Sequence, residues 1–242
     1  MSDRVPGPDG ATAPSPLLPG PAWPPAVGPQ PWRQGLLGVL GGIGAGKSEF
    51  CRLLRESAGW PVLDADAFGH EALAAGSPIL APLLRRFGPG ILQEGGAIDR
   101  GALARIVFAD AAALASLNAL THPFILRRIE ESAAALRREG GAPIIVLDAA
   151  LLADWREQLP LALVVLVTSP LWQRLERLRD RGVSRAEALR RMRRQGPEWA
   201  RRRVAHWIVR NQGTREDLRR AAAELASDVL ARASLAPPRE RA

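Results

Sequence analysis

Residues 41–48, Gly-Gly-Ile-Gly-Ala-Gly-Lys-Ser, have the spacing of a phosphate-binding loop, G-x-x-x-x-G-K-[ST]. The apolar run LLGVL precedes them and the helix-like stretch EFCRLLRESA follows, which is the strand–loop–helix context that this motif needs. Glycines let backbone N–H groups approach phosphates closely, and a helix N-terminus favours an anion. We therefore predict that Lys47 reaches the β- and γ-phosphates of a nucleotide and that the Ser48 hydroxyl ligates Mg²⁺. The alternative is an incidental glycine-rich turn.

Lys47 is the only lysine among the 33 basic residues, and all the others are arginine. A compact ammonium at this position, in a chain that otherwise uses arginine, indicates that the loop is in use. The single lysine also excludes the guanine-reading N-K-x-D motif of common GTPases. The chain has no L-S-G-G-Q signature, and Asp148 at the end of a predicted strand is followed by Ala149 rather than by the Glu of many motor ATPases. Phosphate transfer to a small acceptor is therefore favoured over hydrolysis.

Two acids, Asp64 and Asp66, close a second predicted strand within WPVLDADAF, residues 60–68. Side chains two residues apart on a strand share one side, and ligands bind beyond the carboxyl ends of parallel strands. A transferase needs a carboxylate that orients an acceptor hydroxyl and takes its proton. We predict that one acid faces Mg²⁺ or its waters and the other faces the acceptor. The alternative is that Asp66 only caps the following helix.

The remaining pattern alternates strands with helices, which predicts a parallel sheet covered on both faces. Residues 142–150 and 161–169 are buried-strand candidates, and 207–209 is a short one. We predict an α/β fold of the P-loop NTPase type over 35–234. It includes a helical acceptor-binding region at 67–138 and an arginine-rich lid region at 171–203. Helix breaks are expected near Ser77–Pro78, Phe87–Gly96, Gly182, Gly196–Pro197 and Asn211–Gly213.

The lid region holds 12 arginines and 4 acids, a difference of +8 that equals the formal net charge of the whole chain. Most of these arginines are expected on solvated helical faces. Binding of nucleic acid is disfavoured because no aromatic residues are interleaved and no nucleic-acid motif is present. The third interpretation is a lid that folds over a triphosphate. Arg177 and Arg181, one helical turn apart just before Gly182, are its best candidates.

Both ends of the chain differ from this pattern. Residues 1–34 are rich in proline and glycine and are predicted to be a disordered tail, and 235–242 are predicted to be disordered too. The tail is interpreted as having no selected role or as coming from a misassigned start codon, and the alternative is peptide docking through Trp23 or Trp32. The single cysteine, Cys51, excludes an internal disulfide, and no apolar run reaches the ~18–20 residues of a membrane span. We expect a cytoplasmic protein without a membrane or nucleic-acid partner, most simply a monomer.

The sequence resembles dephospho-CoA kinases from about residue 37 to 225. The resemblance is carried in order by GGIGAGKS, VLDADAFGHEALAAGSP, FGPGILQEGGAIDRGALARIVFAD, LNALTHPFI, VLDAALLAD, RLERLRDRGVS, RMRRQGP and VRNQG. It implies transfer of the γ-phosphate of ATP to the ribose 3′-hydroxyl of dephospho-CoA, the last step of coenzyme A synthesis. Asp66 would be the base, Arg177 or Arg181 the lid arginine, and Asn211 would lie by the adenine. The implied sets are Gly42, Ile43, Gly44, Ala45, Gly46, Lys47, Ser48, Glu49 and Asn211 for ATP, and Asp64, His70, Arg100, Asn118 and His122 for the acceptor.

Several positions depart from the family pattern. Leu40 stands where Thr is usual, Glu49 follows Ser48, and residues 150–154 replace P-L-L-F-E. His206 stands in place of an Asp before the last strand, as does Arg210 before Asn211. We expect an active but diverged enzyme, with His122 open to a packing role instead of acceptor contact. A kinase for another small molecule and a non-catalytic ATP-binding regulator stay open as alternatives.

Overall fold

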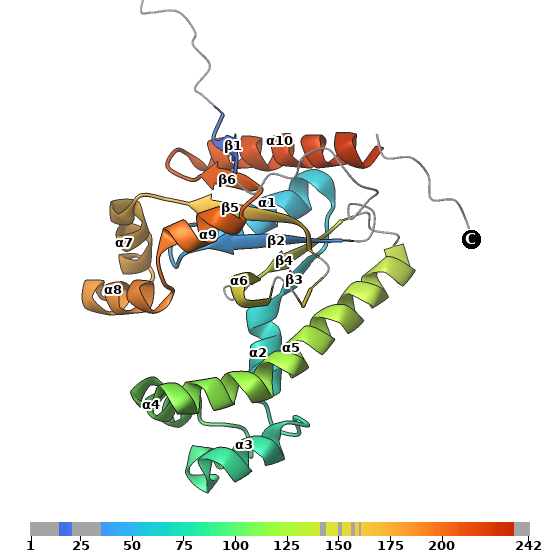
Figure 1. Cartoon of the computed structure of the whole chain (residues 1–242). Coiled ribbons are helices and arrows are strands. Elements are labelled where there is room, and N and C mark those ends of the chain that lie inside the picture. The colour runs from blue at the N-terminus through green and yellow to red at the C-terminus, as the bar shows by residue number, and fades with distance from the viewer. Residues whose placement is uncertain are drawn as a thin grey trace, which may run out of the picture.

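A computed structural model describes residues 15–20, 35–140, 144–149, 152–155, 158–159 and 161–234. A six-stranded sheet lies at its centre with the order β1-β6-β5-β2-β4-β3 (Figure 1). Strands β2 to β6 pair in parallel, which confirms the predicted α/β class, and β1 pairs antiparallel with β6. The strands are β1 (Leu17–Pro19), β2 (Leu36–Gly41), β3 (Val62–Asp64), β4 (Ile145–Asp148), β5 (Leu161–Thr168) and β6 (Trp207–Arg210).

Helices cover both faces of the sheet because its strands bury alternate side chains on each face. In β5, Val165 belongs to one core cluster and Leu166 to the other. Helices α1 and α10 pack on the first face, and α2, α5 and α6 pack on the second. Such two-sided burial is what the apolar runs predict. The bounds are α1 (Lys47–Ala58), α2 (Ala65–Ala72), α5 (Ala111–Gly140), α6 (Leu152–Trp155) and α10 (Arg215–Ser234).

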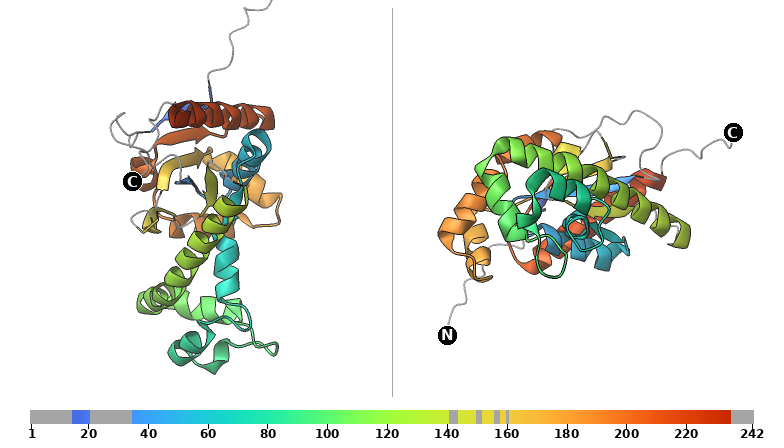
Figure 2. Two further views of the ribbon diagram at one scale, coloured as in Figure 1. Left: turned by 90° about the vertical axis from the view of Figure 1, so that its right-hand side faces the viewer. Right: turned by 90° about the horizontal axis from the view of Figure 1, so that it is seen from below.

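A helical lobe projects away from the sheet (Figure 2). It contains α3 (Leu80–Phe87), the 3-10 helix η1 (Pro89–Ile91), α4 (Arg100–Ala109) and the beginning of α5. The lobe has its own apolar core, in which Leu83 and Ile91 are fully buried. Helix α5 continues from this lobe onto the sheet, so the two parts share one rigid element. The helical content predicted for 67–138 is thereby confirmed.

The lid region forms three short helices, α7 (Leu171–Arg179), α8 (Arg185–Arg194) and α9 (Glu198–Val204). Gly182 and Gly196 separate them and have φ values of 76° and 69°, a left-handed conformation that glycine adopts without strain. The predicted breaks are therefore confirmed. Among the described helices, none is both long enough and apolar enough to cross a bilayer.

One part of the predicted N-terminal tail is corrected by the sheet. Leu17–Pro19 form β1, which pairs with β6 from Leu17 opposite Val209 to Pro19 opposite Trp207. The local composition could not reveal this strand, because its hydrogen-bond partners come from the other end of the chain. Residues 1–14, 21–34 and 235–242, on which the rest of the disorder prediction falls, lie outside the described residues.

Candidate active site

The phosphate-binding loop, residues 41–48, connects β2 to α1 at the carboxyl edge of the sheet. Gly44 and Gly46 have φ values of 76° and 95°. A Cβ on Gly46 would lie 2.1 Å from the Nδ2 atom of Asn211, so this position also needs glycine for space. Helix α1 begins at Lys47, and its first N–H groups, which have no partner within the helix, face the loop. The loop thus has the backbone form that the sequence motif predicts.

Carbonyl groups of this loop are held from the outside. The Ile43 carbonyl accepts a hydrogen bond of 2.9 Å from Nε of Arg174, and the Ala45 carbonyl accepts one of 2.8 Å from Nδ2 of Asn211. In a trans peptide the C=O and the following N–H point in opposite directions. Holding these carbonyls outward therefore turns the following N–H groups toward the inner side of the loop, where an anion would bind.

Arg177 lies behind the phosphate-binding loop, although we predicted it as a lid arginine. Its Nη1 donates to Ser169 Oγ at 3.1 Å and to the Gly44 carbonyl at 3.3 Å, and its Nη2 donates to the Asn211 carbonyl at 3.3 Å. Burial, followed by the charge of Arg181, lowers the pKa of Arg177. These contacts make Arg177 a support of the loop. Arg181 is exposed beyond the end of α7, and its lid role stays a prediction.

Lys47 forms an ion pair with Asp148, the last residue of β4. Both side chains are largely buried, with exposed fractions of 14% and 9%. Burial lowers the pKa of Lys47, and Cys51, Asp66 and Asp64 lie near enough to oppose that shift. The lysine thus lies among three carboxylates. From the sequence, Asp148 was noted only as the acid that ends a strand and has no Glu after it.

The prediction that Asp64 and Asp66 share one side of a strand is wrong. Strand β3 ends at Asp64, and Asp66 lies in the first turn of α2. Asp64 is the helix cap, since its Oδ1 accepts hydrogen bonds from the N–H groups of Asp66, at 2.9 Å, and Ala67, at 3.4 Å. The helix is therefore capped by an acid, as the alternative predicted, but the cap is Asp64 and not Asp66. The exposed Asp66 projects from the first turn of a helix whose cap is already supplied.

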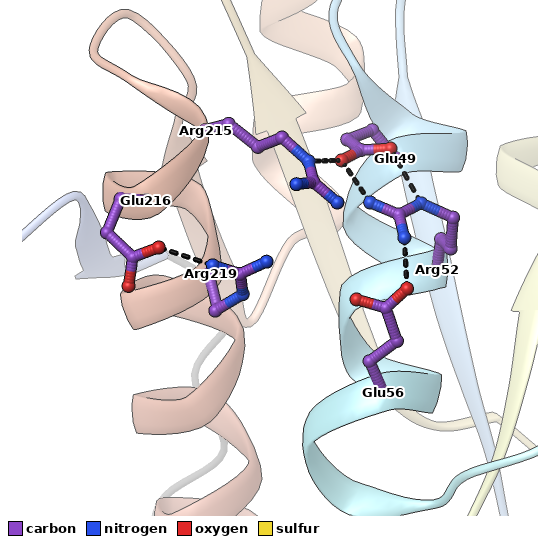
Figure 3. Close-up of polar contacts among 6 residues, drawn as sticks. All are labelled: Glu49, Arg52, Glu56, Arg215, Glu216 and Arg219. Atoms are coloured by element: carbon purple, nitrogen blue, oxygen red, sulfur yellow. Dashed lines mark hydrogen bonds and ion pairs between the residues drawn. The ribbon is translucent and has the colours of Figure 1, made fainter.

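The negative charge of Glu49, at the start of α1, is balanced by two arginines (Figure 3). Its carboxylate accepts hydrogen bonds from Arg52 at 2.6 and 2.9 Å and from Arg215 of α10 at 2.7 Å. Hydrogen bonding to Arg52 is the largest cause that lowers the pKa of Glu49 to about 2. The carboxylate thus joins α1 to α10, and contact of Glu49 with a nucleotide stays a prediction.

The predicted acceptor residues other than Asp64 lie farther along the chain toward the helical lobe. His70 is exposed in the last turn of α2, and Arg100 is exposed at the first residue of α4. Asn118 and His122 lie one turn apart on α5 and are half-buried. The His122 ring meets the Trp155 ring edge-on at 5.2 Å between centroids, which supports the packing role. Contact of these residues with an acceptor stays a prediction.

Comparisons with known proteins agree with this geometry. A family model described as dephospho-CoA kinase matches residues 35–217. The chain belongs to the dephospho-CoA kinase family. The dephospho-CoA kinase of Frankia casuarinae is 38% identical over 196 residues, which is 81% of this chain and 84% of that protein. The dephospho-CoA kinase of Thermus thermophilus is 40% identical over 187 residues, 77% of this chain and 87% of that protein.

Solved structures of related chains have the same fold. The crystal structure of TT1252 from Thermus thermophilus matches with a TM-score of 0.68 and 38% identity, covering 81% of this chain and 98% of that one. A dephospho-CoA kinase from Campylobacter jejuni matches with a TM-score of 0.58 and 24% identity, covering 80% and 96%, and supports the fold alone. Family membership makes this chain a kinase that uses ATP to phosphorylate a hydroxyl group in the final step of coenzyme A synthesis.

Sequence reasoning missed one residue and one cavity of this member of the dephospho-CoA kinase family. Gln195, after α8, accepts a hydrogen bond of 2.8 Å from the Ile43 N–H through Oε1, and no local pattern announces this contact. A cavity of about 480 Å³ opens beside the loop and is lined by Ser169, Leu171, Arg174, Glu198, Arg210 and Gln212, among others. Two of these lining residues, Arg210 and Gln212, are the sequence neighbours of Asn211, which we predicted to lie by the adenine.

The departures from the dephospho-CoA kinase pattern have partial explanations. His206, where Asp is usual, accepts a hydrogen bond of 2.8 Å at Nδ1 from the Val164 N–H, while its own N–H donates to the Val164 carbonyl at 2.8 Å. The ring thereby completes the pairing of β5 with the chain entering β6. Arg210 lines the cavity beside the loop. Of the altered segment 150–154, Leu152 is buried in the core, and the remaining side chains lie outside the described residues.

Proposed function

We propose that this chain transfers the γ-phosphate of ATP to the ribose 3′-hydroxyl of dephospho-CoA, with Asp66 as the base. The observation that carries this assignment is the grouping of Asp66, Asp64 and Asp148 around Lys47 at the phosphate-binding loop. A cation for phosphate and an exposed carboxylate for a hydroxyl lie at one edge of the sheet, as phosphate transfer to an alcohol requires.

The reaction divides simply among these residues. Asp66 accepts the proton of the acceptor hydroxyl while the hydroxyl oxygen forms a bond to the γ-phosphorus. The bond between that phosphorus and the β–γ bridging oxygen breaks, and ADP leaves. Lys47 and the inward N–H groups of the loop stabilise the charge on the phosphates, which is the main source of catalysis in such sites. Arg181 supplies further positive charge from the lid region.

The oxygen atoms near the loop suit a magnesium ion. Ser48 offers a hydroxyl and Asp148 offers a carboxylate, and both are hard oxygen ligands of the kind that Mg²⁺ prefers. Among the described residues no cluster of three or more acidic, histidine or cysteine ligands forms a dedicated cage. This agrees with an ion held by one or two protein groups and by the nucleotide. When bound, Mg²⁺ would neutralise part of the phosphate charge.

We place the adenine in the cavity beside the loop, next to Asn211, and the acceptor between α2 and the helical lobe. Residues 67–138 then serve as the acceptor-binding region and 171–203 as the lid, which keeps water from the phosphoryl group. We propose that the chain acts as a monomer in the cytoplasm, with ATP and dephospho-CoA as its partners and with neither nucleic acid nor membrane.

The test is a coupled assay with Mg-ATP and dephospho-CoA that measures ADP and coenzyme A together. Asp66→Asn should lower kcat by about 10²–10⁴-fold, the contribution typical of general base catalysis, with ATP binding retained. Glu216→Gln is the matched control, since Glu216 is also an exposed acid in a helical first turn but lies on α10. ATP binding without coenzyme A formation by the native chain would contradict the proposal and favour a regulator.

A further inference from the structure

Strand β1 lies outside residues 35–217, the part of the chain that the family model matches. It nevertheless completes the sheet at the free edge of β6. The Arg210 N–H donates to the Pro16 carbonyl at 2.8 Å, and the Gly20 N–H donates to the His206 carbonyl at 2.8 Å. These two bonds bracket the whole length of β6. Pro19 is tolerated because the strand lies at the sheet edge, where one row of N–H groups needs no partner.

Side chains fix this segment as well as the backbone. Leu17 packs against the core cluster that α1 and α10 cover, and Ser15 Oγ bonds to Glu224 of α10. Gly20 marks a close approach of two backbones, since a Cβ there would lie 2.2 Å from the Ala205 carbonyl oxygen. The segment is therefore fitted to β6 in one register.

β6 leads directly to the group that holds the phosphate-binding loop. Its last residue, Arg210, is the one bonded to Pro16, and the next residue is Asn211. The Asn211 N–H donates to the Thr168 carbonyl at 2.8 Å, and its side chain holds Ala45. A continuous hydrogen-bonded path thus runs from residue 16 through β6 to the loop.

We propose that residues 15–20 are a positioning strand for the nucleotide site: by closing the β6 edge in the same chain, they keep Asn211 in place to hold the phosphate-binding loop. Without β1, β6 is paired on one side only, and the end that carries Asn211 loses its outer hydrogen bond. ATP must then order that end on binding, so its affinity falls. Acceptor affinity is set elsewhere and should not change. The inference rests on the proposed nucleotide site but not on the identity of the acceptor.

The experiment compares the full chain with a variant that lacks residues 1–20. Binding of a non-hydrolysable ATP analogue is measured by calorimetry, and KM is measured for each substrate. Loss of one or two backbone hydrogen bonds that support the site should raise the Kd of the analogue about five- to tenfold. The KM for dephospho-CoA should stay within about twofold, because the acceptor binds elsewhere. A uniform loss of folded enzyme would change neither the Kd of the analogue nor this KM, so it cannot imitate the expected result. A synthetic peptide of residues 12–22, added in excess, should restore the Kd. Analogue binding is scored without transfer, so a chain that fails to make coenzyme A still tests the strand.

Gly20→Ala gives a second test that does not depend on the deletion folding. Its Cβ conflicts with Ala205, so we expect faster amide hydrogen exchange at residues 207–210 and a raised Kd for the analogue. Gly95→Ala is the matched glycine variant for stability, since nothing lies within 4 Å of a Cβ there. An unchanged Kd and unchanged exchange in Gly20→Ala would overturn the proposal. A dimer that the deletion converts to monomer would overturn pairing within one chain and indicate strand exchange between copies.

Discussion

Asn211 holds Ala45 across 166 residues of sequence, through a hydrogen bond of 2.8 Å from Nδ2 to the backbone carbonyl. Its Oδ1 accepts a hydrogen bond from Nη2 of Arg177 at 3.4 Å, and Asn211 is buried, with only 7% of its surface exposed. The two ends of the amide are thus bonded to different groups, which fixes the orientation of the side chain. The shape of the phosphate-binding loop is therefore maintained by a residue near the far end of the chain.

Asn211→Ala should raise the Kd for ATP by about tenfold, because the Ala45 carbonyl loses its partner and the loop loses a restraint. Asn211→Asp keeps an acceptor for Arg177 but has no donor for Ala45, so it should not restore the affinity. Isothermal titration with a non-hydrolysable ATP analogue gives the measurement. A native Kd in either variant would show that the contact does not shape the nucleotide site.

Arg177→Ala should lower stability and ATP affinity, whereas Arg181→Ala should lower kcat alone. Arg177 bonds to Gly44, Ser169 and Asn211, and loss of such part-buried hydrogen bonds costs about 2 kcal/mol, or about 4–8 °C in Tm for a chain of this size. Exposed Arg181 makes no comparable contribution to the fold. Thermal denaturation and steady-state kinetics on both variants separate the two roles. A native Tm with a reduced kcat for Arg177→Ala would return that residue to the lid role.

The sequence was sufficient for the parallel strands of the sheet and for the phosphate-binding loop, because both depend on local signals. Apolar runs bounded by glycine predict buried strands, and the loop motif lies within eight consecutive residues. β1 could not be predicted in this way, since the three residues 17–19 are stable as a strand only against β6. The same limit applies to Arg177, whose local helix favours a lid and whose contacts are made with distant backbone.

The acids at Asp64 and Asp66 show a second kind of limit. Two acids with one residue between them fit both a strand that continues through Asp66 and a helix capped by Asp64. The choice depends on where β3 stops, and that is decided by its pairing with β4, which ends with Asp64 opposite Asp148. Similarly, a carboxylate at Glu49 looks unfavourable in sequence until α10 brings Arg215 to it.

Glu49→Gln should make the protein less sensitive to acid. The pKa of Glu49 is lowered from an ordinary value of 4.5 to about 2, so its stabilising effect is complete above pH 4.5 and is lost as the pH falls toward 2. The carboxylate is 34% exposed, so solvent screening reduces its contribution to about 1 kcal/mol. Urea denaturation of both proteins at pH 7 and pH 3 measures the difference. A constant difference between the two proteins across this range would contradict the assignment.

Asp148→Asn should change how ATP binding responds to magnesium. Asp148 is the ion-pair partner of Lys47 and adds negative charge where the phosphates bind. In the absence of Mg²⁺, the variant should bind ATP more tightly than the native chain, by about tenfold, since one repulsive carboxylate is gone and Lys47 is released to the phosphates. With Mg²⁺ present, the native chain gains a carboxylate ligand that the variant lacks, so the order of affinities should reverse. Glu216→Gln, at an acid that is 71% exposed on α10, serves as the control and should leave both affinities unchanged. If magnesium strengthens ATP binding equally in the native chain and in Asp148→Asn, then Asp148 neither competes with the phosphates nor holds the ion, and its role is limited to orienting Lys47.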